Sequence, residues 1–287
     1  MKRNQSKKRI VALSVLLLAC TALITAACLV TNKKVQAAQS VPLSEAGIDM
    51  SDQSVQLIAR GGLSAVTPEN TTIAVETACR EGFTAVEFDI RETLDGVWVL
   101  MRERTLGRMT DGCGRIAKQT YFELLEYSVD NGANIALYPD TKIAELEDVL
   151  NVCAMYNVRP FIRVEQSSGA GLAKLAAIFS ARSQTQMFAV LSADRELLQR
   201  FRELSPKTEL WFDAGRLSAG QISWLEANRG VGVVVDAGKK ANTDEKIEQV
   251  MNAGIKTAVW RADDAKTIEH YYTLGVNMFY TNAVLPG

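Results

Sequence analysis

The sequence predicts an α/β protein whose main part is a (β/α)8 barrel, with a small insertion after the second strand and an apolar helix at the N-terminus. Short β-rich runs and helical periods alternate through eight units, the last of which lacks its helix. This pattern is typical of parallel strands joined by helical crossovers. About 250 residues follow the first 37, which is the usual length of one such barrel.

The first 37 residues are predicted to be a membrane anchor or a signal segment. Five basic residues precede an uncharged apolar run over 10–30, and Lys33 and Lys34 follow it. The run is long enough to cross a bilayer, and the charge bias keeps the N-terminus in the cytoplasm. Cleavage of a signal peptide after Ala37 is the alternative, and a buried core helix is a third interpretation. The first two place the barrel outside the cytoplasm of a bacterial-type cell, membrane-anchored or secreted, behind a polar tether over 38–53.

The barrel sequence, residues 54–287, opens with a predicted strand at 55–59 and a glycine turn. Arg60 follows the strand and supplies a planar fork that suits phosphate or carboxylate, while the glycines after it let the backbone come close to a ligand. A helix is predicted next over about 70–82, with Asn70 as its N-cap and Gly82 as its stop.

Glu87 and Asp89 stand two residues apart in the second predicted strand, at 84–90. In a strand their carboxylates leave on one face, while Val86, Phe88 and Ile90 leave on the other. Such a strand lines a site. A half-exposed antiparallel strand with two solvated acids is the other interpretation.

The rest of the chain continues the same alternation after an insertion over about 91–142. The insertion begins with a hairpin turn at Asp95-Gly96, which leads to a strand at 97–101, a Gly-rich loop and a short helix. An amphipathic helix over 138–156 follows. The remaining strands are predicted at 159–164, 186–191, 208–212, 230–236, 255–260 and 276–281, with helices at 171–182, 193–204, 217–228, 243–254 and 263–275.

Composition and charge fit a globular domain and give no support to nucleic-acid binding. The chain is 47% hydrophobic and 23% charged, and beyond residue 37 it holds 25 basic against 33 acidic residues. Cys79, Cys113 and Cys153 lie in this part, an odd number without metal-like spacing, so at most one disulfide is expected.

Six ordered blocks between residues 59 and 110 resemble the signature of the glycerophosphodiester phosphodiesterase family, which reads H-R-G, P-E-N-T, E-x-D, T-x-D-G, H-D and L-x-R-x-T. The blocks here are Ala59-Arg60-Gly61, Pro68-Glu69-Asn70-Thr71, Glu87-Phe88-Asp89, Thr93-Leu94-Asp95-Gly96, Arg102-Glu103 and Leu106-Gly107-Arg108-Met109-Thr110. By this resemblance, Ala59 and Arg102 stand at the positions of the two catalytic histidines.

The resemblance implies a TIM barrel in which Glu87 and Asp89 hold a divalent metal, Ca²⁺ or Mg²⁺, against a phosphodiester that Arg60 also binds. On the third strand, Arg163 takes the place of a third metal-binding glutamate and Glu165 that of a lysine. A guanidinium there would pair with the two acids and replace the metal. The alternative is that Glu165 still reaches a metal.

No residue is expected to replace the two histidines. Alanine carries no proton, and arginine stays protonated at any relevant pH. His270 is the only histidine of the chain, and its place in the middle of a predicted helix indicates a surface or packing role.

Three further residues of the predicted site have two interpretations each. Arg102 either adds a second cation beside Arg60 for an anionic head group or is a solvated or ion-paired residue. Trp260 either belongs to the packing of the barrel or stacks on a sugar or glycerol. Glu69 either fixes the first loop or contacts the ligand.

We therefore expect a membrane-tethered, catalytically degenerate family member, a pseudoenzyme, that binds a phosphodiester, phospholipid head group or polyol-phosphate and needs no cofactor. One alternative is an active metal-dependent phosphodiesterase that releases glycerol 3-phosphate and an alcohol, with Glu87, Asp89 and Glu165 as metal ligands. Another is a non-catalytic partner protein tethered to a membrane complex.

Overall fold

The computed structural model describes residues 41–42, 55–182 and 187–286, and its main sheet closes into an eight-stranded parallel barrel. The barrel strands are β2 (Gln56–Arg60), β3 (Ala85–Glu92), β5 (Arg159–Val164), β6 (Ala189–Ser192), β7 (Glu209–Gly215), β8 (Val231–Asp236), β9 (Thr257–Trp260) and β10 (Met278–Thr281). Because β2 pairs with both β10 and β3, the sheet has no open edge there. The predicted fold class is confirmed.

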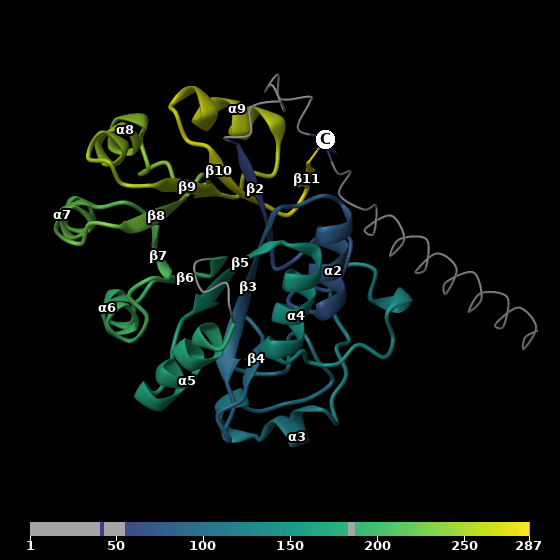
Figure 1. Cartoon of the computed structure of the whole chain (residues 1–287). Helices are drawn as coiled ribbons and strands as arrows, with labels where there is room; N and C mark the ends of the chain where they lie inside the picture. Colours follow the sequence, from purple (N-terminus) through teal and green to yellow (C-terminus); the bar gives the residue numbers. More distant parts are fainter. Residues whose placement is uncertain (1–40, 43–54, 183–186, 287) are drawn as a thin grey trace, which may run out of the picture. The chain divides into compact units, whose positions relative to one another are not determined.

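Seven helices of the described part surround the strands, as Figure 1 shows. They are α2 (Thr72–Arg80), α4 (Leu146–Tyr156), α5 (Gly169–Ser180), α6 (Arg195–Leu204), α7 (Ala219–Ala227), α8 (Asp244–Asn252) and α9 (Ala265–Thr273). The N-cap of α2 is Thr71, whose side chain accepts from the Ala74 amide, so the prediction of Asn70 as the cap was wrong. Asn70 adopts a left-handed conformation with φ of 55° and turns toward the barrel instead.

The insertion between β3 and α4 builds a small second core. Strand β4 (Trp98–Leu100) pairs antiparallel with β3, and η2 (Ile116–Lys118), α3 (Tyr121–Leu124) and η3 (Ile135–Leu137) follow it. The helix predicted over 138–156 begins only at Leu146. Pro139, which lacks an amide hydrogen, lies in a turn before this helix.

Two short strands pair with each other in a separate two-stranded sheet. Strand β1 (Val41–Pro42) runs parallel to β11 (Val284–Leu285). Among the residues that the structure describes, no helix is long and apolar enough to cross a membrane. The apolar run over 10–30 and most of the predicted tether lie outside those residues.

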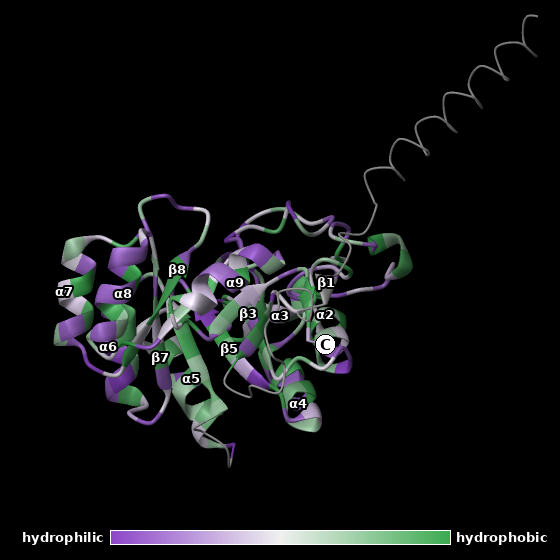
Figure 2. Cartoon of the chain, turned by 90° about the horizontal axis from the view of Figure 1, so that it is seen from above, coloured by the Kyte–Doolittle hydropathy of each residue, from purple (hydrophilic) through white to green (hydrophobic). Residues whose placement is uncertain are grey.

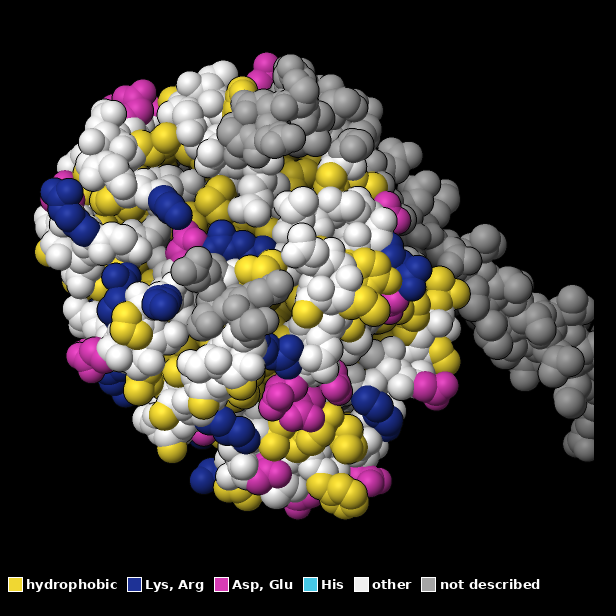
Figure 3. Space-filling model, viewed as in Figure 1, with side chains coloured by type: hydrophobic (Ala, Val, Ile, Leu, Met, Phe, Trp, Pro, Cys, Tyr) yellow, Lys and Arg dark blue, Asp and Glu magenta, His cyan; other side chains and the backbone are white. Residues whose placement is uncertain are grey.

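Hydropathy follows the layers of the barrel. In Figure 2 the strands are largely hydrophobic, and helices such as α6, α7 and α8 carry both hydrophobic and hydrophilic residues. On the face of the molecule seen in Figure 3, basic and acidic side chains lie among one another.

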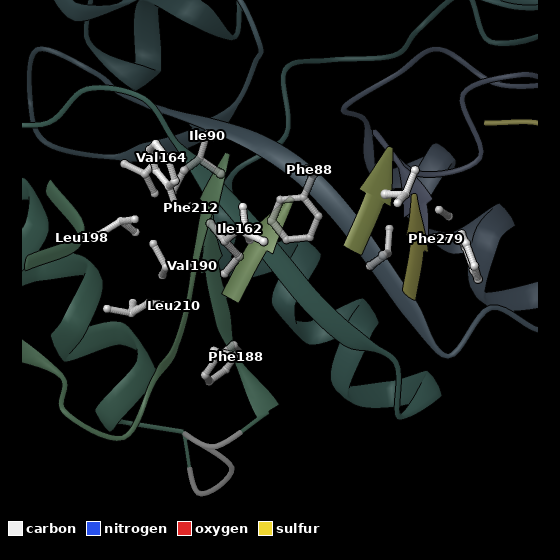
Figure 4. Packing of buried hydrophobic residues seen from close by; sticks show 14 of the residues in the cluster. Phe88, Ile90, Ile162, Val164, Phe188, Val190, Leu198, Leu210, Phe212 and Phe279 are labelled. Carbon is white, nitrogen blue, oxygen red and sulfur yellow. The ribbon is translucent and has the colours of Figure 1, made fainter. Parts of the chain in front are cut away.

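The alternation of side chains along each strand separates an outer core from the barrel interior. Val86, Phe88 and Ile90 of β3 face outward, into the core between sheet and helices, as predicted. Figure 4 shows Phe88 and Ile90 there, with Ile162 and Val164 of β5. The alternate residues of each strand therefore point into the barrel.

Candidate functional site

A layer of large side chains fills the lower part of the barrel interior. Phe161 meets Tyr280 edge-to-face at 5.8 Å between ring centroids and lies 6.1 Å from Trp211. The other members of this layer, which we call the floor, are Ile58, Ala85, Ala189, Leu191, Val234 and Ala258. Because the floor is apolar and closed, polar chemistry is confined to the mouth, the region at the C-terminal ends of the barrel strands.

Above the floor, the guanidinium of Arg163 lies among four carboxylates, those of Glu87, Asp89, Asp213 and Glu165. Its Nε donates to Glu87 Oε1 at 2.9 Å and lies 3.5 Å from Asp89 Oδ1, and its Nη1 donates to Asp213. Only 10% of the Arg163 side chain is exposed, and Glu87 is fully buried. Arg163 stands opposite Asp89 in the register of β3 and β5, which places the charges at one level.

The remaining oxygens of the two β3 acids are also satisfied. The Gly61 amide donates to Glu87 Oε2 at 3.2 Å. Asn70 donates to Asp89 Oδ2 at 3.1 Å and accepts from the Asp89 amide at 2.8 Å, so its left-handed backbone serves to clamp the strand.

Electrostatic attraction keeps Asp89 and Arg163 ionised although both are buried. Burial opposes the charge of Asp89, but the guanidinium groups of Arg102 and Arg163 outweigh it and lower the Asp89 pKa. Burial likewise opposes the charge of Arg163, yet Glu87, Asp213 and Asp89 raise its pKa well above the ordinary value. Asp89 and Arg163 therefore hold fixed opposite charges.

Arg102 is ion-paired at the rim of the mouth. Its Nε lies 3.1 Å from Asp89 Oδ2, and its Nη1 lies 3.2 Å from Glu69 Oε2. Glu69 also pairs with Arg108, which in turn pairs with Glu103 at 2.6 Å. Of the two interpretations of Arg102, the structure shows the ion-paired arrangement, and Glu69 holds the first loop through both arginines.

Arg60 is the one arginine among these mouth residues whose guanidinium forms no hydrogen bond or ion pair with the described part of the chain. Its carbon Cζ lies 4.7 Å from the centroid of the Trp260 ring, and its Nε is buried without a partner. The Arg261 guanidinium lies 4.5 Å from the same ring and pairs with Asp236 at 3.3 Å. Trp260 thus holds two arginines at the mouth.

Ala59 lies on the other face of β2 from Arg60. Its side chain is fully buried in the outer core, whereas Ile58 faces the floor and Arg60 faces Trp260. Neighbouring residues of a strand face opposite sides, so the Ala59 methyl group points away from the mouth. On β2, the position that opens to the site is therefore Arg60.

Other predicted residues lie at or away from the cluster. Glu165 is half-buried, and its Oε1 lies 3.3 Å from Arg163 Nη1. His270 lies on the outside of α9, 3.0 Å from Asp244, as expected for a surface residue. Cys79, Cys113 and Cys153 are free thiols, and burial raises the pKa of Cys79 to about 11.

Two members of the cluster were not among the predicted site residues. Asp213 lies near the end of β7, and its position after the apolar run at 208–212 marks it as a strand-end residue, but it was given no role. Asn70 was assigned to a helix cap, and only its positive φ and contact with Asp89 reveal its role.

The geometry defines a class: a TIM barrel with a charged site at the C-terminal ends of its strands. The chain belongs to the glycerophosphoryl diester phosphodiesterase family, whose profile matches residues 60–285. This confirms the family predicted from the six motif blocks.

Sequence relatives carry names from the same family. Glycerophosphodiester phosphodiesterase 1 of Mus musculus is 36% identical over 129 residues, which are 44% of this chain and 38% of the mouse protein. Glycerophosphodiester phosphodiesterase of Bacillus subtilis (strain 168) is 22% identical over 251 residues, covering 81% of this chain and 85% of that protein. The match thus spans well under half of the mouse protein.

Solved structures share the fold. A phosphodiesterase of Oleispira antarctica, solved in complex with the product sn-glycerol-3-phosphate, superposes with a TM-score of 0.70 at 21% identity, covering 79% of this chain and 93% of that one. A putative glycerophosphodiester phosphodiesterase of Galdieria sulphuraria gives 0.70 at 17% identity, covering 80% and 94%.

Family members are generally Ca²⁺- or Mg²⁺-dependent, and the residues present here do not fit such an ion. Both oxygens of Glu87 accept hydrogen bonds, from Arg163 and Gly61. Asp89 faces two guanidinium groups, and a divalent cation between these acids would lie against the Arg163 charge.

Proposed function

We propose that this chain is a catalytically degenerate member of its family that binds a phosphodiester or polyol-phosphate group at the mouth without efficient hydrolysis. The observation that carries the proposal is the buried Arg163 guanidinium, which lies between Glu87, Asp89 and Asp213. It supplies a permanent positive charge where the family resemblance implies an exchangeable metal ion.

The arginines at the mouth cannot act as a general acid or base near neutral pH. Arg60 is the site-facing residue of β2 and Arg102 the one after β4, and arginine stays protonated. A positioned acid or base typically contributes about a hundred- to ten-thousand-fold in rate, so a site without either should hydrolyse a phosphodiester very slowly.

Binding of an anion is supported by the state of Arg60. Its guanidinium is held by the Trp260 ring and leaves its donors without a protein acceptor, as a bidentate phosphate ligand requires. The product bound by the Oleispira antarctica phosphodiesterase, sn-glycerol-3-phosphate, indicates the chemical class of ligand.

An active, metal-dependent phosphodiesterase remains the alternative, favoured by the names of the sequence relatives. It would use Glu87, Asp89 and Glu165 as ligands and would release glycerol 3-phosphate. A further alternative is a non-catalytic partner protein. For all three we propose a location outside the cytoplasm, supported by the basic residues and apolar run of the first 37 residues.

The test compares hydrolysis by the full chain, kept in mild non-ionic detergent, with that of an Arg102→His/Arg163→Glu variant, which keeps Arg60. Glycerophosphoethanolamine and a chromogenic phosphodiester serve as substrates, with Ca²⁺, Mg²⁺ or EDTA. We expect no turnover by the natural chain and metal-dependent turnover by the variant. Turnover by the natural chain that EDTA abolishes would overturn the degenerate site.

A binding measurement separates the proposal from the partner-protein alternative. By calorimetry, glycerophosphoglycerol should bind the natural chain and should bind Arg60→Ala about tenfold or more weakly, since a charge-assisted pair is lost. An Arg200→Ala variant on the outer helix α6 serves as the control. Absence of saturable binding to the natural chain would favour the partner protein.

A further inference from the structure

A second cavity, of about 590 Å³, lies beside the mouth between the insertion and the loop after β5. Four basic residues line it: Arg91 at the end of β3, and Arg104, Arg115 and Lys118 from the insertion. Its only acid is Glu92. Motif comparison assigned no role to this group of residues.

Glu92 does not neutralise these cations, because its carboxylate is already bound at the start of α5. It accepts from the Ser167 hydroxyl at 3.1 Å, from the Ser168 amide at 3.0 Å and from the Ser168 hydroxyl at 2.9 Å. An acid bound to serine donors and a helix N-terminus is held away from basic partners. The cavity is therefore left with a surplus of positive charge.

The basic residues form no ion pair within the part of the chain that the structure describes. Arg104, Arg115 and Lys118 are exposed, while Arg91 is half-buried with its Nη1 inaccessible and without a partner. Burial is the main cause that lowers the pKa of Arg91. The charges of Glu165, Asp89 and Glu103 oppose this shift, and the nearby charge of Arg104 adds to it. Repulsion among these cations would be relieved by a bound anion.

The cavity is connected to the mouth through Arg91. Its Nε donates to the Arg102 carbonyl at 3.1 Å, and Arg102 is ion-paired with Asp89. Arg91 also follows Asp89 by two residues on β3, a step of about 7 Å along a strand. A ligand that reaches from the mouth into the cavity would therefore meet two separate groups of arginines.

We propose that this cavity is a second anion subsite, which takes the next phosphate of a ligand that carries two or more phosphodiester groups. The proposal rests on the proposed function, since the first phosphate is the one held by Arg60 at the mouth. Linking two phosphates makes the second contact intramolecular and raises affinity for the longer ligand. Exposed Leu94 and buried Ile116 in the same lining offer apolar contact to the carbon linker.

The test uses two soluble probes: glycerophosphoglycerol, with one phosphodiester, and bis(glycerophospho)glycerol, with two. Calorimetry with the full chain in detergent should show the second probe binding about tenfold or more tightly than the first. Arg104→Glu/Lys118→Glu should remove this advantage and leave the affinity for the first probe unchanged. Arg200→Glu/Lys207→Glu, on α6 and the loop after it, makes the same change in net charge and should keep the advantage.

Failure of the subsite and failure of the proposed function give different results. The subsite would be overturned if the two probes bound with equal affinity, or if the second probe still bound more tightly to Arg104→Glu/Lys118→Glu. In either case, Arg60-dependent binding of the first probe would still support the proposed function. Binding of neither probe would overturn both. A third result is that the second probe binds more tightly only when Arg104 and Lys118 are present, while Arg60→Ala changes neither affinity. This result would support the subsite in the cavity and overturn the role of Arg60.

The same chemistry occurs in a free polyol-phosphate chain and in the head group of a two-phosphate lipid. Sedimentation with phosphatidylcholine vesicles, with and without cardiolipin, distinguishes the two sources. If cardiolipin increases binding of the natural chain more than that of Arg104→Glu/Lys118→Glu, the ligand is the lipid. If it does not, and the soluble probe result holds, the ligand is the free chain.

Discussion

The Nε of Arg163 donates to Glu87 Oε1 at 2.9 Å, inside a barrel where Glu87 is fully buried and Arg163 is 10% exposed. Taking such charges out of water is costly, and the cost is met only when each charge keeps its partners. The stability of the barrel should therefore depend on the ion pairs at its mouth.

Arg163→Ala should lower the free energy of unfolding by about 3–5 kcal/mol, because it leaves buried carboxylates without compensation. Urea unfolding followed by circular dichroism measures this. Arg80→Ala, at an exposed ion pair on α2, is the control and should change stability little. An equally small decrease in the free energy of unfolding of Arg163→Ala would contradict a stabilising role of the Arg163 ion pairs.

The same variant should acquire sensitivity to Ca²⁺. With the guanidinium gone, Glu87, Asp89 and Asp213 are free to bind a cation, and binding to the folded state alone raises stability. We expect Ca²⁺ to raise the urea midpoint of Arg163→Ala and to leave that of the natural chain unchanged. Equal responses of the two chains would show that Arg163 does not replace an ion.

Stability should fall with pH on the acid side. The pKa of Asp89 is lowered in the fold, so its contribution is complete above the pKa of an unfolded aspartate, about 3.9, and is lost as pH falls through the lower folded value. Urea midpoints from about pH 6 down to about pH 2 measure this. Asp89→Asn should show a shallower decline, and an identical decline would exclude Asp89 as a source.

Asn70→Gly should cost about 2–3 kcal/mol, because the left-handed backbone is kept while two hydrogen bonds to buried Asp89 are lost. Asn157 has nearly the same φ, 54°, at the exposed end of α4. Asn157→Gly is therefore the matched control and should be close to neutral by chemical denaturation. If the two variants behaved alike, the clamp on β3 would be unimportant.

Gly62→Ala should destabilise the barrel far more than Gly82→Ala. Both glycines have positive φ, but a Cβ at Gly62 would lie 2.5 Å from the Ala74 carbonyl carbon, whereas nothing lies within 4 Å at Gly82. We expect about 1 kcal/mol for Gly82→Ala and clearly more for Gly62→Ala in thermal unfolding. Similar melting temperatures of the two variants would show that α2 shifts away from an added Cβ at position 62 without a cost in stability.

Strand periodicity was sufficient to predict which face of β3 forms the site. Glu87 and Asp89 point inward because they alternate with Val86, Phe88 and Ile90, and alternation depends on local geometry alone. The same rule, applied to Ile58, identifies Arg60 as the inward residue.

Contacts across the barrel could not be predicted in the same way. Asp213 reaches Arg163 because β5 and β7 flank β6 on the inside of the curved sheet, although the two residues are 50 positions apart in sequence. The binding of Glu92 at the start of α5 depends on a similar tertiary approach, over 76 positions. The surplus of positive charge in the cavity therefore could not be predicted from the sequence.

The buried guanidinium also bears on how such a protein responds to its surroundings. A barrel that supplies its own counter-charge should assemble equally well in metal-poor and metal-rich media, and chelators should leave it intact. Occupancy of the mouth would then depend on the concentration of phosphodiesters rather than on that of calcium. On the proposed function, the Arg163 side chain takes the place of one exchangeable ion, so binding at the mouth needs no metal.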